Sequence, residues 1–138
     1  MKVVLDTNVL VSGLLSPYGP CGEIVRMMTG GAIQVCHDAR ILAEYGEVLR
    51  RPLFRIDPDE LASVLDYIES AGQSAASAPL SRPLPDKDDE AFLEVALGAG
   101  ARCLITGNMK HYPEKLRMGV RVLSPAQFIT FYRARRYE

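Results

Sequence analysis

The fold is decided near the start of the chain, in the stretch KVVLDTN at residues 2–8. Residues 3–5 are apolar and lack the alternation of a half-exposed strand, which is typical of a strand buried on both faces of a parallel sheet. Asp6 follows this strand directly. Because sites in open parallel sheets form beyond the carboxyl ends of the strands, we expect the Asp6 carboxylate at that edge. A helix cap or a turn would also place an acid here, so Asp6 alone does not define a site.

Strand-like and helix-like segments alternate through the rest of the chain. Further strands are predicted at residues 32–36, 102–106 and 120–123. Helices are predicted at residues 9–15 and 21–29, from Asp38 to near Arg51, after the cap Asp57, at 86–97 before Gly98 and Gly100, and after Ser124-Pro125. Residues 74–85 are rich in Ser, Ala and Pro and are expected to form a connecting loop with room for a short strand. This alternation predicts a single α/β domain over residues 1–138, with a parallel sheet covered on both faces.

Composition agrees with one globular domain of 138 residues, of which 48% are hydrophobic and 24% are charged. The three cysteines, Cys21, Cys36 and Cys103, lack zinc-ligand spacing and are expected to be free thiols in a reducing cytoplasm. The first residues do not resemble a secretory signal, and no run approaches the roughly 20 apolar residues of a membrane helix. We therefore expect a soluble, cytoplasmic protein.

A second candidate acid, Glu44, lies in the helix predicted after Asp38. Ile41, Tyr45 and Val48 form an apolar stripe on this helix, and Glu44 falls within the stripe. A carboxylate on a core-facing stripe is unfavourable unless it is paired or bound to a cation. The alternative is a glutamate at the border of the stripe that reaches solvent or an arginine.

A third group of acids begins the helix predicted at residues 86–97. Asp89 precedes Phe92, Leu93 and Ala96 by three, four and seven residues, so it continues their inward stripe by one turn. Asp86 lies one turn earlier, at the expected cap. Acids at a helix start are favoured by the helix dipole, which explains Asp86 but does not require Asp89 to face inward.

The fourth element is the run Thr106-Gly107-Asn108, directly after a predicted strand. Thr106 and Asn108 offer oxygen atoms at the same sheet edge as Asp6, although a plain Gly-Asn turn is the alternative. An all-oxygen ligand set favours Mg²⁺ or Mn²⁺, and such an ion can activate water for a phosphodiester displacement. His37 and His111 are expected in surface or loop positions without a catalytic role, with contact to a phosphate as the alternative for His111.

The formal net charge of −1 gives the chain no overall basic field. Four of its carboxylates are the candidate ligands above. If a metal ion neutralised these four, the rest of the protein would carry a charge of +3. A weakly acidic total is therefore compatible with a nucleic-acid substrate.

Taken together, these blocks resemble the PIN-domain family. Its pattern is an early strand ending in Asp-Thr-Asn, a mid-chain helical acid, an acid leading a Phe-Leu and Ala-Leu helix, and a strand ending in Thr-Gly-Asp or Thr-Gly-Asn. The corresponding blocks here are VVLDTNVL at 3–10, LAEY at 42–45, DKDDEAFLEVAL at 86–97 and LITGN at 104–108. Their order covers essentially the whole chain. The resemblance implies a three-layer α/β/α sandwich with a central, mainly parallel sheet.

The resemblance also implies an activity and partners. Family members are Mg²⁺- or Mn²⁺-dependent endoribonucleases, commonly the VapC-type toxin of a toxin–antitoxin pair. They usually form homodimers and are inhibited by an antitoxin whose C-terminal segment enters the active-site groove. In this chain the apolar helix at residues 9–15 is a candidate part of the dimer face.

Carried onto this sequence, the family's metal-holding acids are Asp6, Glu44 and Asp89, with Asp86 as an auxiliary catalytic residue. Asn8 and Thr106 would shape the site. The chain departs from many relatives at Asn108, where they carry aspartate. Asparagine supplies an oxygen but no charge, so one-metal chemistry, or a second ion brought by the RNA, is favoured.

RNA binding would require basic residues around the groove, since phosphate contacts give affinity without sequence preference. The candidates are Arg50, Arg51, Lys110, Lys115, Arg133, Arg135 and Arg136. The alternative is that these residues form an ordinary solvated surface.

Two other functions remain open from the sequence. An Asp-dependent phosphatase with Asp6 as its nucleophile would carry a second aspartate two residues later, where this chain has Asn8. A binding module that keeps the fold without turnover would bind RNA or protein and leave RNA intact.

Overall fold

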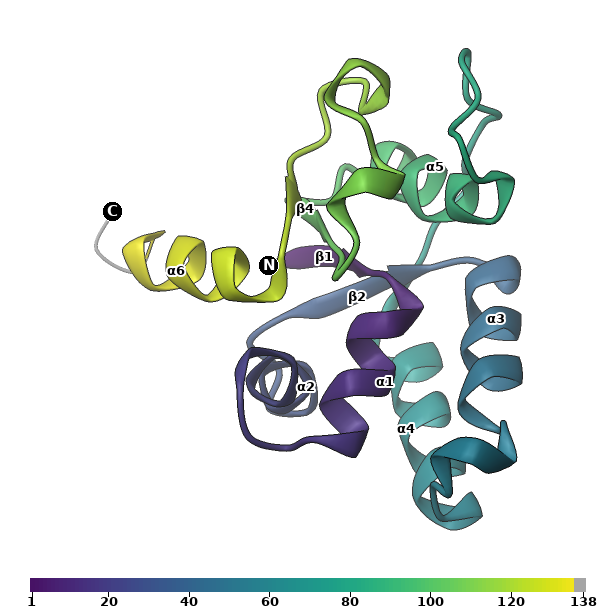
Figure 1. Ribbon diagram of the computed structural model, residues 1–138, viewed down its shortest axis with the longest axis vertical. Helices are drawn as coiled ribbons and strands as arrows, with labels where there is room; N and C mark the ends of the chain where they lie inside the picture. Colours follow the sequence, from purple (N-terminus) through teal and green to yellow (C-terminus); the bar gives the residue numbers. More distant parts are fainter. Residues whose placement is uncertain (136–138) are drawn as a thin grey trace.

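Five parallel strands form the centre of the computed structural model, which describes residues 1–135 (Figure 1). Their order across the sheet is β3-β2-β1-β4-β5. Their bounds are Lys2–Leu5 for β1, Gln34–His37 for β2, Gln73–Ser74 for β3, Cys103–Ile105 for β4 and Val122–Leu123 for β5. The chain builds outward from β1 to β3 on one side, and then returns to place β4 and β5 on the other. The carboxyl ends of β1 and β4 are therefore the switch point at which connections diverge and sites form.

Six α-helices surround the sheet, and Figure 1 shows α5 on one side of it and α1, α2 and α4 on the other. Their bounds are Thr7–Leu15 for α1, Pro20–Thr29 for α2, Ala39–Leu49 for α3, Pro58–Ala71 for α4, Glu90–Ala99 for α5 and Pro125–Arg135 for α6. Short 3₁₀ turns occupy Pro52–Phe54, Lys87–Asp89, Met109–His111 and Glu114–Leu116. The predicted α/β/α layers and parallel sheet are confirmed. Among residues 1–135, no helix is both long and apolar enough to cross a bilayer.

The helix predicted at residues 86–97 differs from the structure at both ends. A 3₁₀ turn precedes α5, and α5 continues through Gly98 to Ala99, followed by the cap residue Gly100, whose φ of 62° suits glycine. Gly98 does not end the helix; a glycine stands there because the backbone of the neighbouring loop packs directly against the helix. A Cβ at Gly98 would lie 2.2 Å from the carbonyl oxygen of Ala76.

The loop at residues 75–86 is fixed to α5 by carboxylates. Glu94 is buried and accepts a hydrogen bond from the Leu80 amide at 3.1 Å. Glu90 accepts one from the Leu84 amide at 3.0 Å. The other oxygen of Glu94 pairs with Arg40 of α3 at 2.7 Å. This loop is thus held in place although it lacks regular structure.

Two expectations about exposure are wrong. His37 ends β2 and is only 2% exposed, and its ring packs beside Gly72, where a Cβ would lie 2.3 Å from the Ile68 carbonyl oxygen, 2.4 Å from that of Val35 and 2.9 Å from the ring. Within residues 1–135, neither nitrogen of this ring has a hydrogen-bond partner. In α1, Val9 and Leu10 are buried in the core, so these two of the three apolar residues proposed for a dimer face cannot supply it, whereas the third, Leu14, is half-buried.

Tyr45 connects α3 to the end of β1. Its side chain is fully buried, and its hydroxyl donates to the carbonyl oxygen of Leu5 at 2.6 Å. Leu5 directly precedes Asp6, and Tyr45 directly follows Glu44. This hydrogen bond therefore fixes the end of β1, which carries Asp6, relative to α3, which carries Glu44.

Replacing Tyr45 with Phe should lower the free energy of unfolding by about 1–2 kcal/mol, because the buried Leu5 carbonyl loses its donor while the ring still fills its space. Urea denaturation of the metal-free protein measures this loss. Tyr67→Phe is the matched control, since the Tyr67 hydroxyl donates to a backbone oxygen at a half-buried position that water can reach. Equal losses in the two variants would contradict the role given to Tyr45.

Candidate active site

The four predicted acids line one cleft of about 360 Å³ beyond the carboxyl ends of β1 and β4. Asp6 comes from the end of β1, Glu44 from α3, and Asp86 and Asp89 from the turn before α5. The cleft wall consists of Asp6, Thr7, Asn8, Val11, Ser12, Glu44, Val48, Phe54, Asp86, Asp88, Asp89 and His111. Acids far apart in the sequence thus face a common space.

Asp6 is buried and held by two hydroxyl groups. The Thr106 hydroxyl donates to its Oδ2 at 2.8 Å, and the Tyr112 hydroxyl lies 3.4 Å from the same oxygen. Thr106 also accepts the amide hydrogen of Asn108 at 3.0 Å. The threonine after β4 therefore positions both the carboxylate after β1 and the start of the following loop.

Glu44 is half-buried, and the Thr7 hydroxyl donates a hydrogen bond to its Oε2. Thr7 is the first residue of α1, which begins two residues earlier than the sequence predicts. Asn8 is exposed, and its Oδ1 accepts the Gly107 amide hydrogen at 3.2 Å. The Asp-Thr-Asn run thus contributes one acid and two positioning contacts.

Asp89 is buried, and His111 lies against it. The Nδ1 atom of His111 is 2.9 Å from Oδ2 of Asp89, while its Nε2 atom is 2.8 Å from the amide nitrogen of Asn108. The histidine was expected away from the chemistry, yet it lines the cleft. Its spacing of three residues from Asn108, one helical turn, was the available signal.

Asp86 is exposed and accepts the Asp88 amide hydrogen at 2.9 Å, as the capping interpretation predicts. Capping does not remove it from the cleft. One oxygen of Asp86, one oxygen of Asp89 and a ring nitrogen of His111 lie within 4.8 Å of one another.

Burial raises the pKa values of the inner acids, and the negative charge of Asp6 raises two of them further. Burial raises the pKa of Asp6 despite the Thr106 hydrogen bond. Burial first, and then the negative charge of Asp6, raises the pKa of Asp89 to about 6. Burial likewise raises the pKa of Glu44, with Asp6 again adding to the effect. Asp6 therefore repels both Asp89 and Glu44 in a poorly hydrated space, where a cation would stabilise the charged forms of all three.

The residues present fit a divalent cation. Oxygen donors dominate the cleft, as Mg²⁺ and Mn²⁺ prefer. The Oδ2 atom of Asp89 is buried and receives no well-aligned hydrogen bond from any described residue. An unsatisfied, buried carboxylate oxygen among further acids is the position that a metal ion would satisfy.

The sequence model of the PIN domain family matches residues 2–110 of this chain. The chain belongs to the PIN domain family. Among solved structures, this PIN domain is similar to a chain in the crystal structure of VapBC2 from Rickettsia felis bound to a DNA fragment from their promoter. The TM-score is 0.59 at 14% identity, over 90% of this chain and 98% of the other, which is a likeness of fold. A search of the curated proteins finds no match.

The predicted RNA-binding residues of this PIN domain are spread over its surface. Lys110 is exposed on the 3₁₀ turn that also carries His111, and Lys115 is exposed on the next 3₁₀ turn, at Glu114–Leu116. Arg50 lies beside Ile56 and Pro58 at the far end of α3, and Arg51 pairs with Glu47 of the same helix at 3.8 Å. Of these four residues, only Lys110 directly neighbours a residue of the cleft wall, His111.

The arginines of α6 lie elsewhere. Arg133 pairs with Glu23 of α2 at 3.0 Å, and Figure 1 shows α6 on the far side of the molecule from α3. Arg135 is in the same helix. The structure therefore does not bring Arg133 and Arg135 to the cleft, and Arg136 lies outside the described residues.

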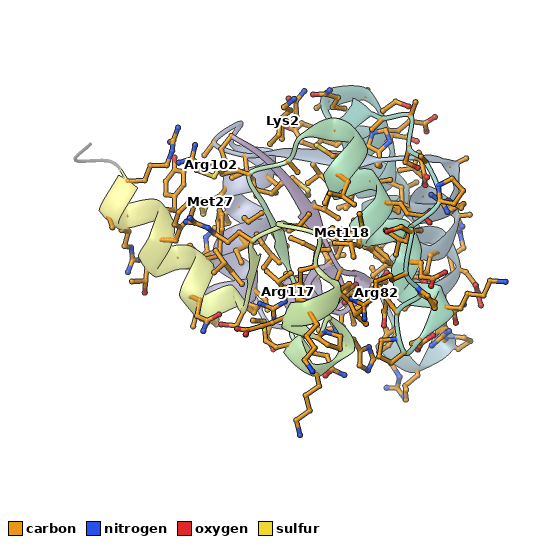
Figure 2. All side chains as sticks on the ribbon, turned by 90° about the horizontal axis from the view of Figure 1, so that it is seen from above. Lys2, Met27, Arg82, Arg102, Arg117 and Met118 are labelled. Atoms are coloured by element: carbon orange, nitrogen blue, oxygen red, sulfur yellow. The ribbon has the colours of Figure 1, made fainter. Side chains whose placement is uncertain are left out.

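Other basic side chains near the site were missed. Arg40 and Lys87 line a second hollow of about 320 Å³ that shares Glu44 and Asp88 with the acidic cleft. Arg40 and Lys87 are separated in the sequence, so no local run of positive charge indicated them. Figure 2 shows two further arginines, Arg82 and Arg117, across the molecule from Lys2, the first residue of β1; neither arginine lines the cleft.

Replacing Asp89 with Asn should stabilise the metal-free protein at neutral pH, because an amide has no charge to desolvate. The folded pKa of about 6 lies above the ordinary 3.8, so ionised Asp89 destabilises the fold increasingly as pH rises from about 4 to above about 6. In EDTA at about pH 7.5, we expect a gain on the order of 1–3 kcal/mol in thermal unfolding. At about pH 2.5 the gain should vanish, because that pH lies well below both the ordinary pKa of 3.8 and the raised value, so the carboxyl is protonated in the folded and the unfolded state.

Asp66→Asn on α4 is the matched control, because Asp66 is exposed and does not line the cleft. Its melting temperature should follow that of the unaltered protein at each pH. A lower melting temperature for Asp89→Asn than for the control at about pH 7.5 would contradict the repulsion argument.

Proposed function

We propose that this PIN domain is a divalent-metal-dependent endoribonuclease. The observation that carries the proposal is the convergence of Asp6, Glu44 and Asp89 in one cleft, where burial raises the pKa values of all three and repulsion from Asp6 adds to the shifts of the other two. Such a cluster destabilises the fold unless it binds a cation, so a binding role accounts for its presence.

The chain's own residues would hold and orient the ion. Asp6, Glu44 and Asp89 supply carboxylate oxygens, and Thr106 and Thr7 fix the orientation of the first two through their hydroxyl groups. When bound, Mg²⁺ or Mn²⁺ supplies an activated water and stabilises the negative charge that develops on the phosphodiester. Asp86 is the auxiliary acid at the cleft rim.

We further propose that the RNA strand crosses Glu44 into the hollow lined by Arg40 and Lys87. Arg40 is held by Glu94 at 2.7 Å and by Asp38 at 2.8 Å, so its position is fixed. Lys87 is exposed and forms no ion pair with a described residue, so it is free to contact a phosphate. Lys110 and Lys115 would contact the strand on the other side of the acids.

The biological role that we propose is that of a toxin in a toxin–antitoxin pair, acting as a homodimer and silenced by a cognate antitoxin. The similarity of fold to a chain of VapBC2 supports this proposal. The acidic cleft suits an antitoxin segment that carries a positive charge.

Two alternatives give different results. A binding module without turnover would leave RNA intact in Mn²⁺. A phosphatase would form a phosphoaspartate at Asp6. Asn8 weighs against it, because this residue occupies the place of that mechanism's second acid and its oxygen is already bound to the Gly107 amide.

Replacing Asp6 with Asn should reduce RNA cleavage at least about a hundredfold, because the substitution removes a charged ligand from the centre of the cluster. Cleavage of an end-labelled RNA in Mg²⁺ or Mn²⁺ measures the rate. EDTA should abolish the activity of the unaltered protein, and added Mg²⁺ or Mn²⁺ should restore it. Asp66→Asn should cut at the original rate.

Undiminished cleavage by Asp6→Asn, or cleavage that persists under chelation, would overturn the metal mechanism. Circular dichroism of each variant separates a lost ligand from a lost fold.

Replacing Lys87 with Ala should raise KM about fivefold with little change in kcat, which corresponds to about 1 kcal/mol for one exposed phosphate contact. Arg133→Ala removes a positive charge from α6, and no change in KM is expected there because α6 lies away from the cleft. An equal rise in both variants would place the RNA path elsewhere.

A further inference from the structure

We propose that His111 is a metal ligand, and that Asp86, Asp89 and His111 form a nitrogen-containing position for a transition-metal ion such as Mn²⁺ beside Asp6 and Glu44. The inference deepens the proposed function and rests on it for the presence of a divalent ion. It adds a ligand that the all-oxygen set predicted from the sequence does not contain.

Distances among the three residues suit one ion. For metal–ligand bonds of about 2.1 Å, adjacent donor atoms lie about 3 Å apart and opposite donors about 4.2 Å apart. The His111 Nδ1 atom is 2.9 Å from Oδ2 of Asp89. One donor atom from each of Asp86, Asp89 and His111 lies within 4.8 Å of the other two. The three side chains can therefore meet at one ion with small movements.

The ion pair between His111 and Asp89 leaves a carboxylate oxygen without an aligned hydrogen bond among the described residues. Oδ2 of Asp89 is fully buried, and no described residue gives it a hydrogen bond of good geometry, although Nδ1 of His111 is close. Two polar atoms at 2.9 Å without hydrogen-bond alignment are arranged as ligands of a common ion would be. Asp89 itself is only 7% exposed, so water does not readily satisfy that oxygen.

Asn108 would orient the histidine. Its amide nitrogen lies 2.8 Å from His111 Nε2, on the ring edge away from Asp89. Coordination through Nδ1 places the ring proton on Nε2, and a half-turn of the Asn108 amide presents Oδ1 to accept that proton's hydrogen bond. Hydrogen bonds of this kind fix the orientation of metal-binding histidines. Asn108 therefore orients the imidazole of His111 as a metal ligand, whereas an aspartate at position 108 would have supplied a negative charge.

A nitrogen donor changes which ion is preferred. Imidazole suits transition metals, whereas Mg²⁺ prefers an all-oxygen shell. We therefore expect the position at His111 to bind Mn²⁺ in preference to Mg²⁺.

Pulsed electron paramagnetic resonance of the Mn²⁺-loaded protein tests the proposal without RNA. The chain has only two histidines, and His37 is buried in the core, so a tag-free protein gives a nearly background-free measurement. We expect a ¹⁴N coupling typical of a directly bound imidazole. His111→Gln should abolish that coupling and weaken Mn²⁺ binding about tenfold in calorimetry, with less than about a threefold change for Mg²⁺.

Glu114→Gln is the matched control, because Glu114 is an exposed acid on the neighbouring turn, and it should keep both the coupling and the affinity. Bound Mn²⁺ without ¹⁴N coupling, no Mn²⁺ binding at all, or an unchanged Mn²⁺ to Mg²⁺ preference in His111→Gln would overturn the proposal. The cleavage assay tests the nuclease proposal independently of the ligand proposal. If the protein shows the coupling but leaves RNA intact, His111 is a metal ligand and the nuclease proposal fails. If cleavage depends on metal but the coupling is absent, the nuclease proposal holds and the ligand proposal fails.

Discussion

Repulsion among carboxylates in a poorly hydrated cleft is the constraint around which this PIN domain is built. Asp6 and Glu44 are held by hydroxyl groups of Thr106 and Thr7, which orient the acids without cancelling their charge. A lysine or arginine in their place would neutralise the cluster and leave nothing for a cation to bind. The neighbouring guanidinium group, that of Arg40, is already engaged by Glu94 and Asp38. The negative charge in the cleft is thus left unneutralised by the basic side chains of residues 1–135 and is available to bind a cation.

The order of the strands explains why these acids meet. Because β1 is central, the segments that leave β1 and β4 diverge at one edge and open a space between them. Tyr45 then fixes α3 against the last residue of β1, which brings Glu44 to the same edge. Each acid therefore lies on an element whose position is set by the apolar core, so the packing of the core determines the geometry of the site.

The sequence predicts those parts of the site that follow from periodicity. Glu44 and Asp89 lie in phase with apolar stripes, and Asp6 ends an apolar strand, so their convergence could be inferred without coordinates. His111 is not in phase with an apolar stripe. It lies on a 3₁₀ turn, and its contact with Asp89 joins segments that are distant in sequence. The burial of His37 was missed for a related reason. Its ring packs beside Gly72, 35 positions along the chain.

The loop at residues 75–86 looks, by composition, like the place where a protein tolerates added sequence. Its amide groups are nevertheless bound by Glu94 and Glu90, and its backbone touches α5 where Gly98 lacks a side chain. A fusion or epitope inserted there would displace Asp86 from the cleft. The turn around Tyr18, which is 91% exposed, is the better point of attachment for a fluorophore or an affinity handle.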